Sequence, residues 1–233
     1  MRIDKFLSHC TDMSRKEIKE LIKKKQIEVS GEIITRPETQ VDEASVVTVS
    51  GKEISYKEYV YLILNKPEGY VSATEDRVYP TVCDLVKDSY GHFNVAPAGR
   101  LDIDTEGLLI LTNDGAFAHD ITSPKKNVYK RYFARVNKPL CEEDVRAFLK
   151  GMEFKDFTSM PAKLEITDNP HEAYVEIAEG KFHQVKRMFE RVGKTVEYLK
   201  RVAIGGLTLP DNLALGDVWE MTQEEIREKI FDK

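Results

Sequence analysis

Short strands separated by turn residues, with few helices between them, dominate residues 59–233 and constrain the fold more than any other feature. The predicted strands are Tyr59–Leu64, Leu108–Leu111, Arg131–Val136, Ala162–Ile166 and Tyr174–Ile177. Helices are predicted over Cys141–Lys150, which opens with acidic residues that suit the positive end of a helix dipole, and over Gln184–Val192. Because strands and helices do not alternate regularly, we expect an α+β domain around a mixed, largely antiparallel sheet with flanking helices.

A smaller module precedes this region. Ser14 and Glu17 have the spacing of a capping box, which predicts a helix that begins directly after Ser14. The stretches Gln26–Ile34 and Val46–Val49 alternate apolar and polar residues as strands do. The N-terminal module is therefore expected to combine helix and small sheet.

A polar and charged stretch, residues 50–59, separates the two regions and is typical of a linker. We therefore expect an N-terminal domain over residues 1–58 and a second domain over residues 59–233. The chain has 233 residues, of which 41% are hydrophobic, and this is sufficient for a core in each domain.

The distribution of charge favours a polyanionic partner although the formal net charge is -5. Basic residues concentrate in three segments, 14–25, 123–138 and 181–201. Aromatic residues lie among the cations of the last two segments, namely Tyr129, Tyr132, Phe133, Phe182, Phe189 and Tyr198. Lysine and arginine release counterions from phosphates, and aromatic rings stack on bases, so this combination indicates nucleic-acid binding.

The chain contains no apolar run of the roughly 20 residues that span a bilayer, and its N-terminus has no signal-peptide pattern. We expect a cytoplasmic protein without a membrane partner. The three cysteines are odd in number and far apart, which indicates neither a disulfide framework nor a zinc site.

Acidic residues crowd the turn within Gly99–Thr112, and several chemistries fit them. Asp102, Asp104 and Glu106 match the first half of a calcium-binding EF-hand loop, but the twelfth position is Asn113, which cannot supply the bidentate carboxylate. An aspartyl phosphatase would place its pair of aspartates after a buried apolar strand, and this pair follows a Pro and Gly turn instead. A glycosidase pair of carboxylates stays open, because the sequence does not reveal their separation.

Two sets of motifs resemble known families. The N-terminal motifs, Arg2–Leu7, Ser14-Arg15 and Ile27–Gly31, resemble the S4 RNA-binding module, a helix pair with a small sheet. The later motifs stand in the order seen in pseudouridine synthases: Asn65–Gly69, Gly99–Asp102, Lys130–Tyr132 and Glu179–Phe189. Together they cover the chain from Arg2 to Glu225, and they are more similar to the branch that modifies small-subunit ribosomal RNA than to the large-subunit branch, which tends to have Asn-Arg in place of Phe182-His183.

The resemblance implies a catalytic set. Asp102 matches the indispensable carboxylate of the family, Lys186 the basic residue that pairs with it, and Tyr132 the active-site tyrosine. An adjacent cation matters because burial alone would raise the pKa of the aspartate and weaken its ionised form. Arg131 stands where relatives commonly have a small polar residue. The residues expected to bind RNA are Arg100, Arg15, Lys16, Lys19, Lys66, His183, Gln184 and Arg187.

The resemblance also implies a function. We expect an enzyme that isomerises a specific uridine to pseudouridine in small-subunit (16S) ribosomal RNA or in a ribosome-assembly intermediate. It would act as a monomer and without a metal or an organic cofactor. The alternatives are a large-subunit ribosomal RNA pseudouridine synthase of the same family, a noncatalytic S4-type ribosome-assembly protein, and a magnesium-dependent aspartyl phosphatase.

Overall fold

The computed structural model describes residues 1–231, which form two compact units. The first unit contains residues 1–60 together with 86–95, and the second contains residues 61–85 and the chain from 96 onward. The assignment of 86–95 to the first unit was not foreseen from the sequence. Within residues 1–231, no helix is long and apolar enough to cross a membrane.

The first unit is a helix pair with a small antiparallel sheet. Its helices are α1 (Ile3–Cys10) and α2 (Arg15–Lys23). The sheet has the order β2-β1-β3-β4, with β1 at Ile27–Val29, β2 at Glu32–Ile33, β3 at Val47–Val49 and β4 at Lys52–Ile54. The predicted capping box is present, because the Glu17 amide donates to Ser14 Oγ and the Ser14 amide donates to the Glu17 carboxylate. Ile3, Phe6 and Ile18 are fully buried in the core.

Residues 84–93 contain three short helical turns, most of which complete the first unit. They are η1 (Asp84–Val86), α3 (Lys87–Tyr90) and η2 (Gly91–Phe93). His92 Nδ1 lies 2.9 Å from Asp12 Oδ1, and the ring of Phe93 meets the ring of His9 edge to face. These contacts join segments about 80 residues apart, which explains why local patterns did not predict them.

The second unit is built on one nine-stranded mixed sheet, as expected. Its main order is β13-β5-β7-β11-β8-β10-β9, with β6 beside β7 and β12 beside β11. Only β7 and β11 pair in parallel; the other pairs are antiparallel. The strands are β5 (Tyr61–Lys66), β6 (Ala96–Pro97), β7 (Glu106–Thr112), β8 (Lys130–Val136), β9 (Lys163–Ile166), β10 (Glu172–Ile177), β11 (Val196–Ile204), β12 (Leu207–Thr208) and β13 (Val218–Met221).

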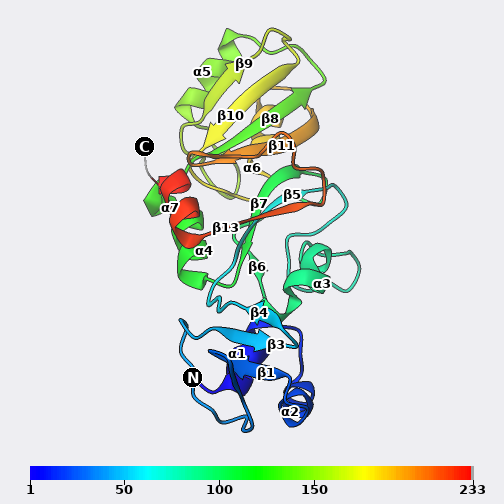
Figure 1. Ribbon diagram of the computed structural model, residues 1–233. Helices are drawn as coiled ribbons and strands as arrows, with labels where there is room; N and C mark the ends of the chain where they lie inside the picture. Colours follow the sequence, from blue (N-terminus) through cyan, green and yellow to red (C-terminus); the bar gives the residue numbers. More distant parts are fainter. Residues whose placement is uncertain (232–233) are drawn as a thin grey trace. The chain divides into compact units, whose positions relative to one another are not determined.

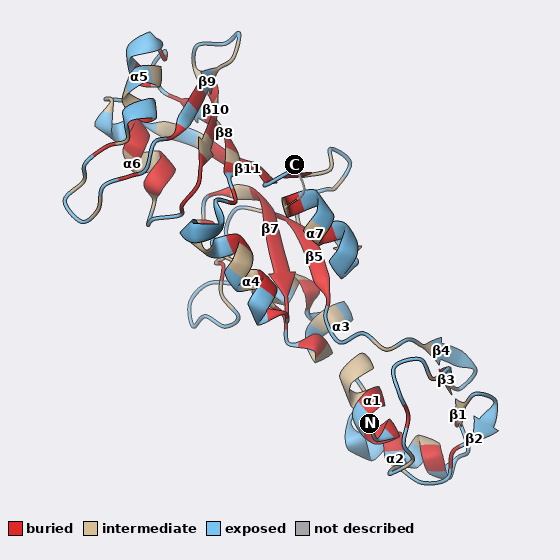
Figure 2. Ribbon diagram, turned by 90° about the vertical axis from the view of Figure 1, so that its left-hand side faces the viewer, coloured by how far each residue is buried: buried red, intermediate tan, exposed pale blue. Residues whose placement is uncertain are grey.

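Helices flank both halves of this sheet. Helix α4 (Gly115–Thr122) and helix α7 (Gln223–Phe231) share a core with strands β5 and β7 (Figures 1 and 2). Helix α5 (Glu142–Lys150) and helix α6 (Gln184–Arg191) lie along one side of the β8–β11 half, where the rings of Phe148 and Phe189 are 5.0 Å apart (Figure 2). A 3-10 turn, η3 (Pro124–Lys126), follows α4.

One row of paired residues crosses the middle of this sheet. Arg201 of β11 pairs with Gly107 of β7 on one side and with Tyr132 of β8 on the other. Gly107 has φ +102, and a Cβ there would lie 2.2 Å from the Arg201 carbonyl oxygen. A glycine is therefore required for β7 and β11 to approach, and their pairing brings Tyr132 close to the turn that precedes β7.

Candidate active site

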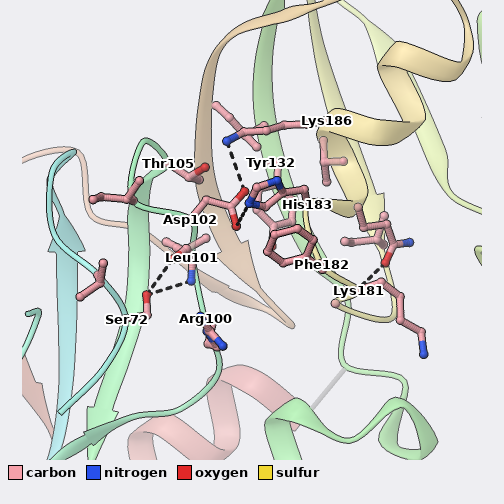
Figure 3. Close-up of a pocket in the computed structure, with 17 residues that line it drawn as sticks. Ser72, Arg100, Leu101, Asp102, Thr105, Tyr132, Lys181, Phe182, His183 and Lys186 are labelled. Atoms are coloured by element: carbon pink, nitrogen blue, oxygen red, sulfur yellow. Dashed lines mark hydrogen bonds and ion pairs between the residues drawn. The ribbon is translucent and has the colours of Figure 1, made fainter. Parts of the chain in front are cut away.

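A pocket of about 320 Å³ lies where the turn before β7, strand β8 and the start of helix α6 meet. Asp102, Tyr132, Lys186 and Arg100 all line it (Figure 3). These residues come from separate parts of the sequence, so the fold assembles the catalytic set that the resemblance implies.

The backbone around Asp102 is fixed from the segment 66–72. The Ser72 hydroxyl donates to the Leu101 carbonyl at 2.9 Å and accepts from the Leu101 amide at 3.0 Å. The Gly69 amide donates to the Ile103 carbonyl at 2.8 Å. The carboxylate of Asp102 is thus presented from a turn whose flanking peptide groups are already bonded, an arrangement that favours a preorganised site.

Lys66 supports the same turn from inside the protein. This position corrects the expectation that Lys66 contacts RNA. Its side chain is fully buried, and its ammonium donates to the carbonyls of Pro67, Asp102, Ile103 and Thr105 at 2.9–3.3 Å. Burial lowers the pKa of Lys66 to about 8, against the opposing effect of the nearby acidic groups. A lysine with all its donors committed inside the protein supports the turn and is not available to a phosphate.

Lys186 bridges both aspartates of the turn. Its Nζ lies 3.2 Å from Asp102 Oδ2 and 2.5 Å from Asp104 Oδ1. Partial burial is the largest single effect on Asp104 and opposes ionisation, but the hydrogen bond and the charge of Lys186, with smaller contributions, together outweigh it and lower the pKa of Asp104 below its usual range. His183 Nε2 lies on the other side of Asp102, 3.6 Å from Oδ1. Asp102 therefore faces a cation and an imidazole at the start of α6.

The third carboxylate of the turn points elsewhere. Glu106 accepts a hydrogen bond of 2.6 Å from the Tyr198 hydroxyl, and burial together with this bond raises the pKa of Tyr198. Asp102, Asp104 and Glu106 therefore do not converge as calcium ligands would. Within residues 1–231, no group of three or more His, Cys, Asp or Glu side chains is arranged to hold a metal ion.

Tyr132 forms part of the pocket wall, and two cations, Arg201 and Lys130, are buried near it. Its hydroxyl lies 3.5 Å from Arg201 Nη1, and Arg201 Nε donates to the Leu108 carbonyl at 2.7 Å. Arg201 is 4% exposed, and its Nη2 has no partner among the described residues. Lys130, two residues before Tyr132, is also buried, and burial followed by repulsion from Arg201 lowers its pKa to about 8. Their burial arises from the pairing of β8 and β11, so no local sequence signal distinguishes them from exposed cations.

Two other residues expected to contact RNA have structural partners instead. Gln184 is buried and bonds through its side chain to Glu179 and to the backbone of Lys181. Arg187 forms two hydrogen bonds with Asp156, and its guanidinium lies 4.7–4.8 Å from the ring centres of Phe154 and Phe157. These contacts hold the start of α6 and the loop before β9. The buried Gln184 side chain has both its oxygen and its nitrogen bonded within the protein. Arg187 is partly exposed and uses two of its five N–H donors on Asp156, so its contact with RNA stays a prediction.

The remaining predicted RNA contacts are accessible. Arg100 is exposed at the pocket, and His183 is partly exposed there. Arg15, Lys16 and Lys19 are exposed on helix α2 of the first unit. Their contact with RNA stays a prediction.

Comparison with known proteins follows the same division of the chain. A family model described as RNA pseudouridylate synthase matches residues 60–191, and an S4 domain model matches residues 1–47. The chain belongs to the RNA pseudouridylate synthase family.

Full-length relatives of this pseudouridine synthase support the assignment. It is 42% identical to the uncharacterized RNA pseudouridine synthase YtzG of Bacillus subtilis over 231 residues, which cover 97% of each chain. It is 37% identical to ribosomal small subunit pseudouridine synthase A of Escherichia coli over 230 residues, which cover 97% of this chain and 98% of the relative. A crystal structure of a pseudouridylate synthase matches 99% of both chains with 34% identity and a TM-score of 0.69.

Proposed function

We propose that this pseudouridine synthase isomerises a specific uridine of small-subunit (16S) ribosomal RNA, with Asp102 as the catalytic carboxylate. The observation that carries the chemical part is the ion pair of 3.2 Å between Asp102 and Lys186 inside a pocket that Tyr132 also lines. The choice of RNA is supported by full-length similarity to ribosomal small subunit pseudouridine synthase A.

The reaction leaves the base on the same sugar carbon but attaches it through a different atom of the base. The bond from N1 of uracil to C1′ of ribose breaks, a bond from C5 to C1′ forms, C5 loses its proton and N1 gains one. An ionised carboxylate can attack the sugar or the base, or can abstract a sugar proton, without help from a metal. Each route uses the ionised carboxylate of Asp102, and the Lys186 ammonium lies 3.2 Å from it as the paired charge. Tyr132, which lines the same pocket, would stack its ring on the extruded uracil.

The test compares Asp102 with its neighbour Asp104, since both are bonded to Lys186. With a 16S ribosomal RNA transcript or assembly intermediate, we expect Asp102→Asn to lower the single-turnover rate by about 10²–10⁴-fold or more while RNA affinity is kept, because a group in direct contact with the reacting atoms is lost. Asp104→Asn should cost less than about tenfold. Release of tritium from uridine labelled at C5 measures the rate.

Sequencing of ribosomal RNA from cells with and without the protein identifies the target. The proposal predicts the loss of a pseudouridine from small-subunit RNA. A lost site in large-subunit RNA instead would establish the large-subunit alternative. Unchanged RNA together with tight binding would establish a noncatalytic assembly protein, and full turnover by Asp102→Asn would refute the role of that residue.

A further inference from the structure

An exposed aromatic ring stands at the rim of the pocket. Phe182 is 72% exposed and is one of the residues that line the pocket containing Asp102. It lies beside His183, close to Asp102 (Figure 3). A single exposed phenylalanine is common on protein surfaces. Whether this one is a binding site depends on how the ring is held and on which residues surround it.

The turn that carries Phe182 is closed by hydrogen bonds. The Gln184 amide donates to the Lys181 carbonyl at 3.1 Å, and the Lys181 amide donates to Gln184 Oε1 at 3.0 Å. Gln184 Nε2 in turn donates to Glu179 Oε1 at 3.0 Å, and both of these side chains are buried. Phe182 is therefore presented from a turn closed by hydrogen bonds and not from a loose loop.

His183 supports one face of the Phe182 ring. The two ring centres are 3.8 Å apart with 19° between their planes, which is a stacked arrangement. His183 has φ +51, a left-handed conformation that is unfavourable for a residue other than glycine and that concentrates at functional sites. The imidazole Nε2 of His183 lies 3.6 Å from Asp102 Oδ1, and the 72% exposure of Phe182 leaves the far side of its ring to solvent.

Two cations flank the pair. Arg100 and Lys181 line the same pocket, both are exposed, and neither forms a salt bridge with another described residue. A preformed aromatic stack between open cations matches the composition of single-stranded nucleic-acid sites, where rings stack on bases and cations neutralise phosphates. A protein partner that docked on Phe182 would not require unpaired cations beside the ring.

We propose that the Phe182–His183 stack is a platform for the nucleobase adjacent to the target uridine in the RNA. The inference rests on the proposed function. Tyr132 inside the pocket faces the target base in that function, so the exposed ring at the rim is available to the next base along the strand. Stacking of that base would replace the neighbour that it loses when the uridine is extruded, and Phe182 would thereby position the RNA.

The test measures RNA affinity in the Asp102→Asn background, so that binding is separated from turnover. With a small-subunit RNA fragment that contains the mapped uridine, we expect Phe182→Ala and Phe182→Leu each to weaken binding about 10-fold, because leucine keeps the apolar volume but has no ring. Phe182→Tyr should stay within about 3-fold of the parent. Leu149→Ala, which removes a side chain 64% exposed on α5, is the control and should leave affinity unchanged.

Abasic RNAs identify the partner of the ring. If the platform holds the adjacent base, Phe182→Ala should lose about 10-fold on intact RNA but less than about 2-fold on RNA that lacks the base directly 5′ or directly 3′ of the target. Equal losses on intact RNA and on both abasic RNAs would overturn the inference, as would full affinity of Phe182→Leu. The proposed function has a separate readout, since wild-type protein that converts no uridine contradicts that function whatever the effect of Phe182.

Discussion

Three lysines of the second unit show how the surroundings of one residue type determine its role. Lys186 is 18% exposed in its side chain and pairs with two carboxylates, Asp102 and Asp104. Lys66 is buried among carbonyls and supports the turn. Lys130 is buried next to Arg201, and this environment disfavours its charge.

Lys130 makes the stability of the protein depend on pH in the alkaline range. Its pKa is about 8 in the folded protein and 10.5 in its ordinary state. Between these values the unfolded chain binds more protons than the folded chain, so the free energy of unfolding rises with pH. Lys130→Met lacks this contribution. We expect any stability advantage of the variant over wild type to shrink by roughly 2–3 kcal/mol between about pH 7.5 and pH 10.5.

Urea unfolding at several pH values measures this difference. Lys66 titrates in the same range in both proteins, so its contribution cancels. Lys138→Met, which changes an exposed lysine at the end of the same strand region, should follow the wild-type curve. Parallel curves for wild type and Lys130→Met would show that Lys130 is not held in an environment that lowers its pKa.

At the scale of elements, the parallel contact between β7 and β11 positions the site, and Gly107 is the residue that permits it. Gly107→Ala would place a methyl group 2.2 Å from a backbone oxygen at positive φ, so we expect it to destabilise the fold by roughly 3–5 kcal/mol. Gly193→Ala is the matched control. Gly193 has φ +76 after α6 with no heavy atom near the added methyl, so we expect a loss of only about 1 kcal/mol. Equal unfolding midpoints for the two variants in urea would contradict this account.

Elements with a strong local signal were predicted well, whereas those that depend on distant partners were not. The capping box at Ser14 and the acidic start of α5 fix helices through neighbouring residues, and both helices are present. Strand β11 was missed because Lys200 and Arg201 placed it within a basic segment that was interpreted as binding nucleic acid. Its burial arises from pairing with β7 and β8, which no short window of sequence contains.

The candidate site shows the same limit. Family motifs identified Asp102, Tyr132 and Lys186, and the structure places all three around one pocket. The motifs did not distinguish a lysine that faces RNA from one that lies beneath the turn, so Lys66 was assigned wrongly. Arg201 was counted only as part of a basic segment. Burial determined by the tertiary fold separates these cases.

At the scale of the whole molecule, the two features expected to contact RNA lie in different units. The basic helix α2 belongs to the first unit, and the pocket that contains Asp102 belongs to the second. Each unit has its own core. Removing residues 1–58 would take away Asp12, the partner of His92 in the segment 86–95, so truncation would disturb more than RNA binding. Charge substitutions in the intact chain therefore test the role of the first unit more cleanly.

Helix α2 is expected to bind phosphates of the RNA. Lys16 and Lys19 are exposed on it, and removal of each phosphate-binding cation should lower the slope of log affinity against log salt by about 0.7–0.9. We expect the double variant Lys16→Gln and Lys19→Gln to weaken RNA binding at low salt and to reduce the slope by about 1–2. Filter binding of ribosomal RNA at about 50–300 mM salt, in steps of roughly 50 mM, measures this slope.

The double variant Lys150→Gln and Lys155→Gln is the control. It removes the same charge from exposed positions in the second unit and should keep the wild-type slope. If both double variants lower the slope equally, binding depends on net charge alone and helix α2 has no specific part in it.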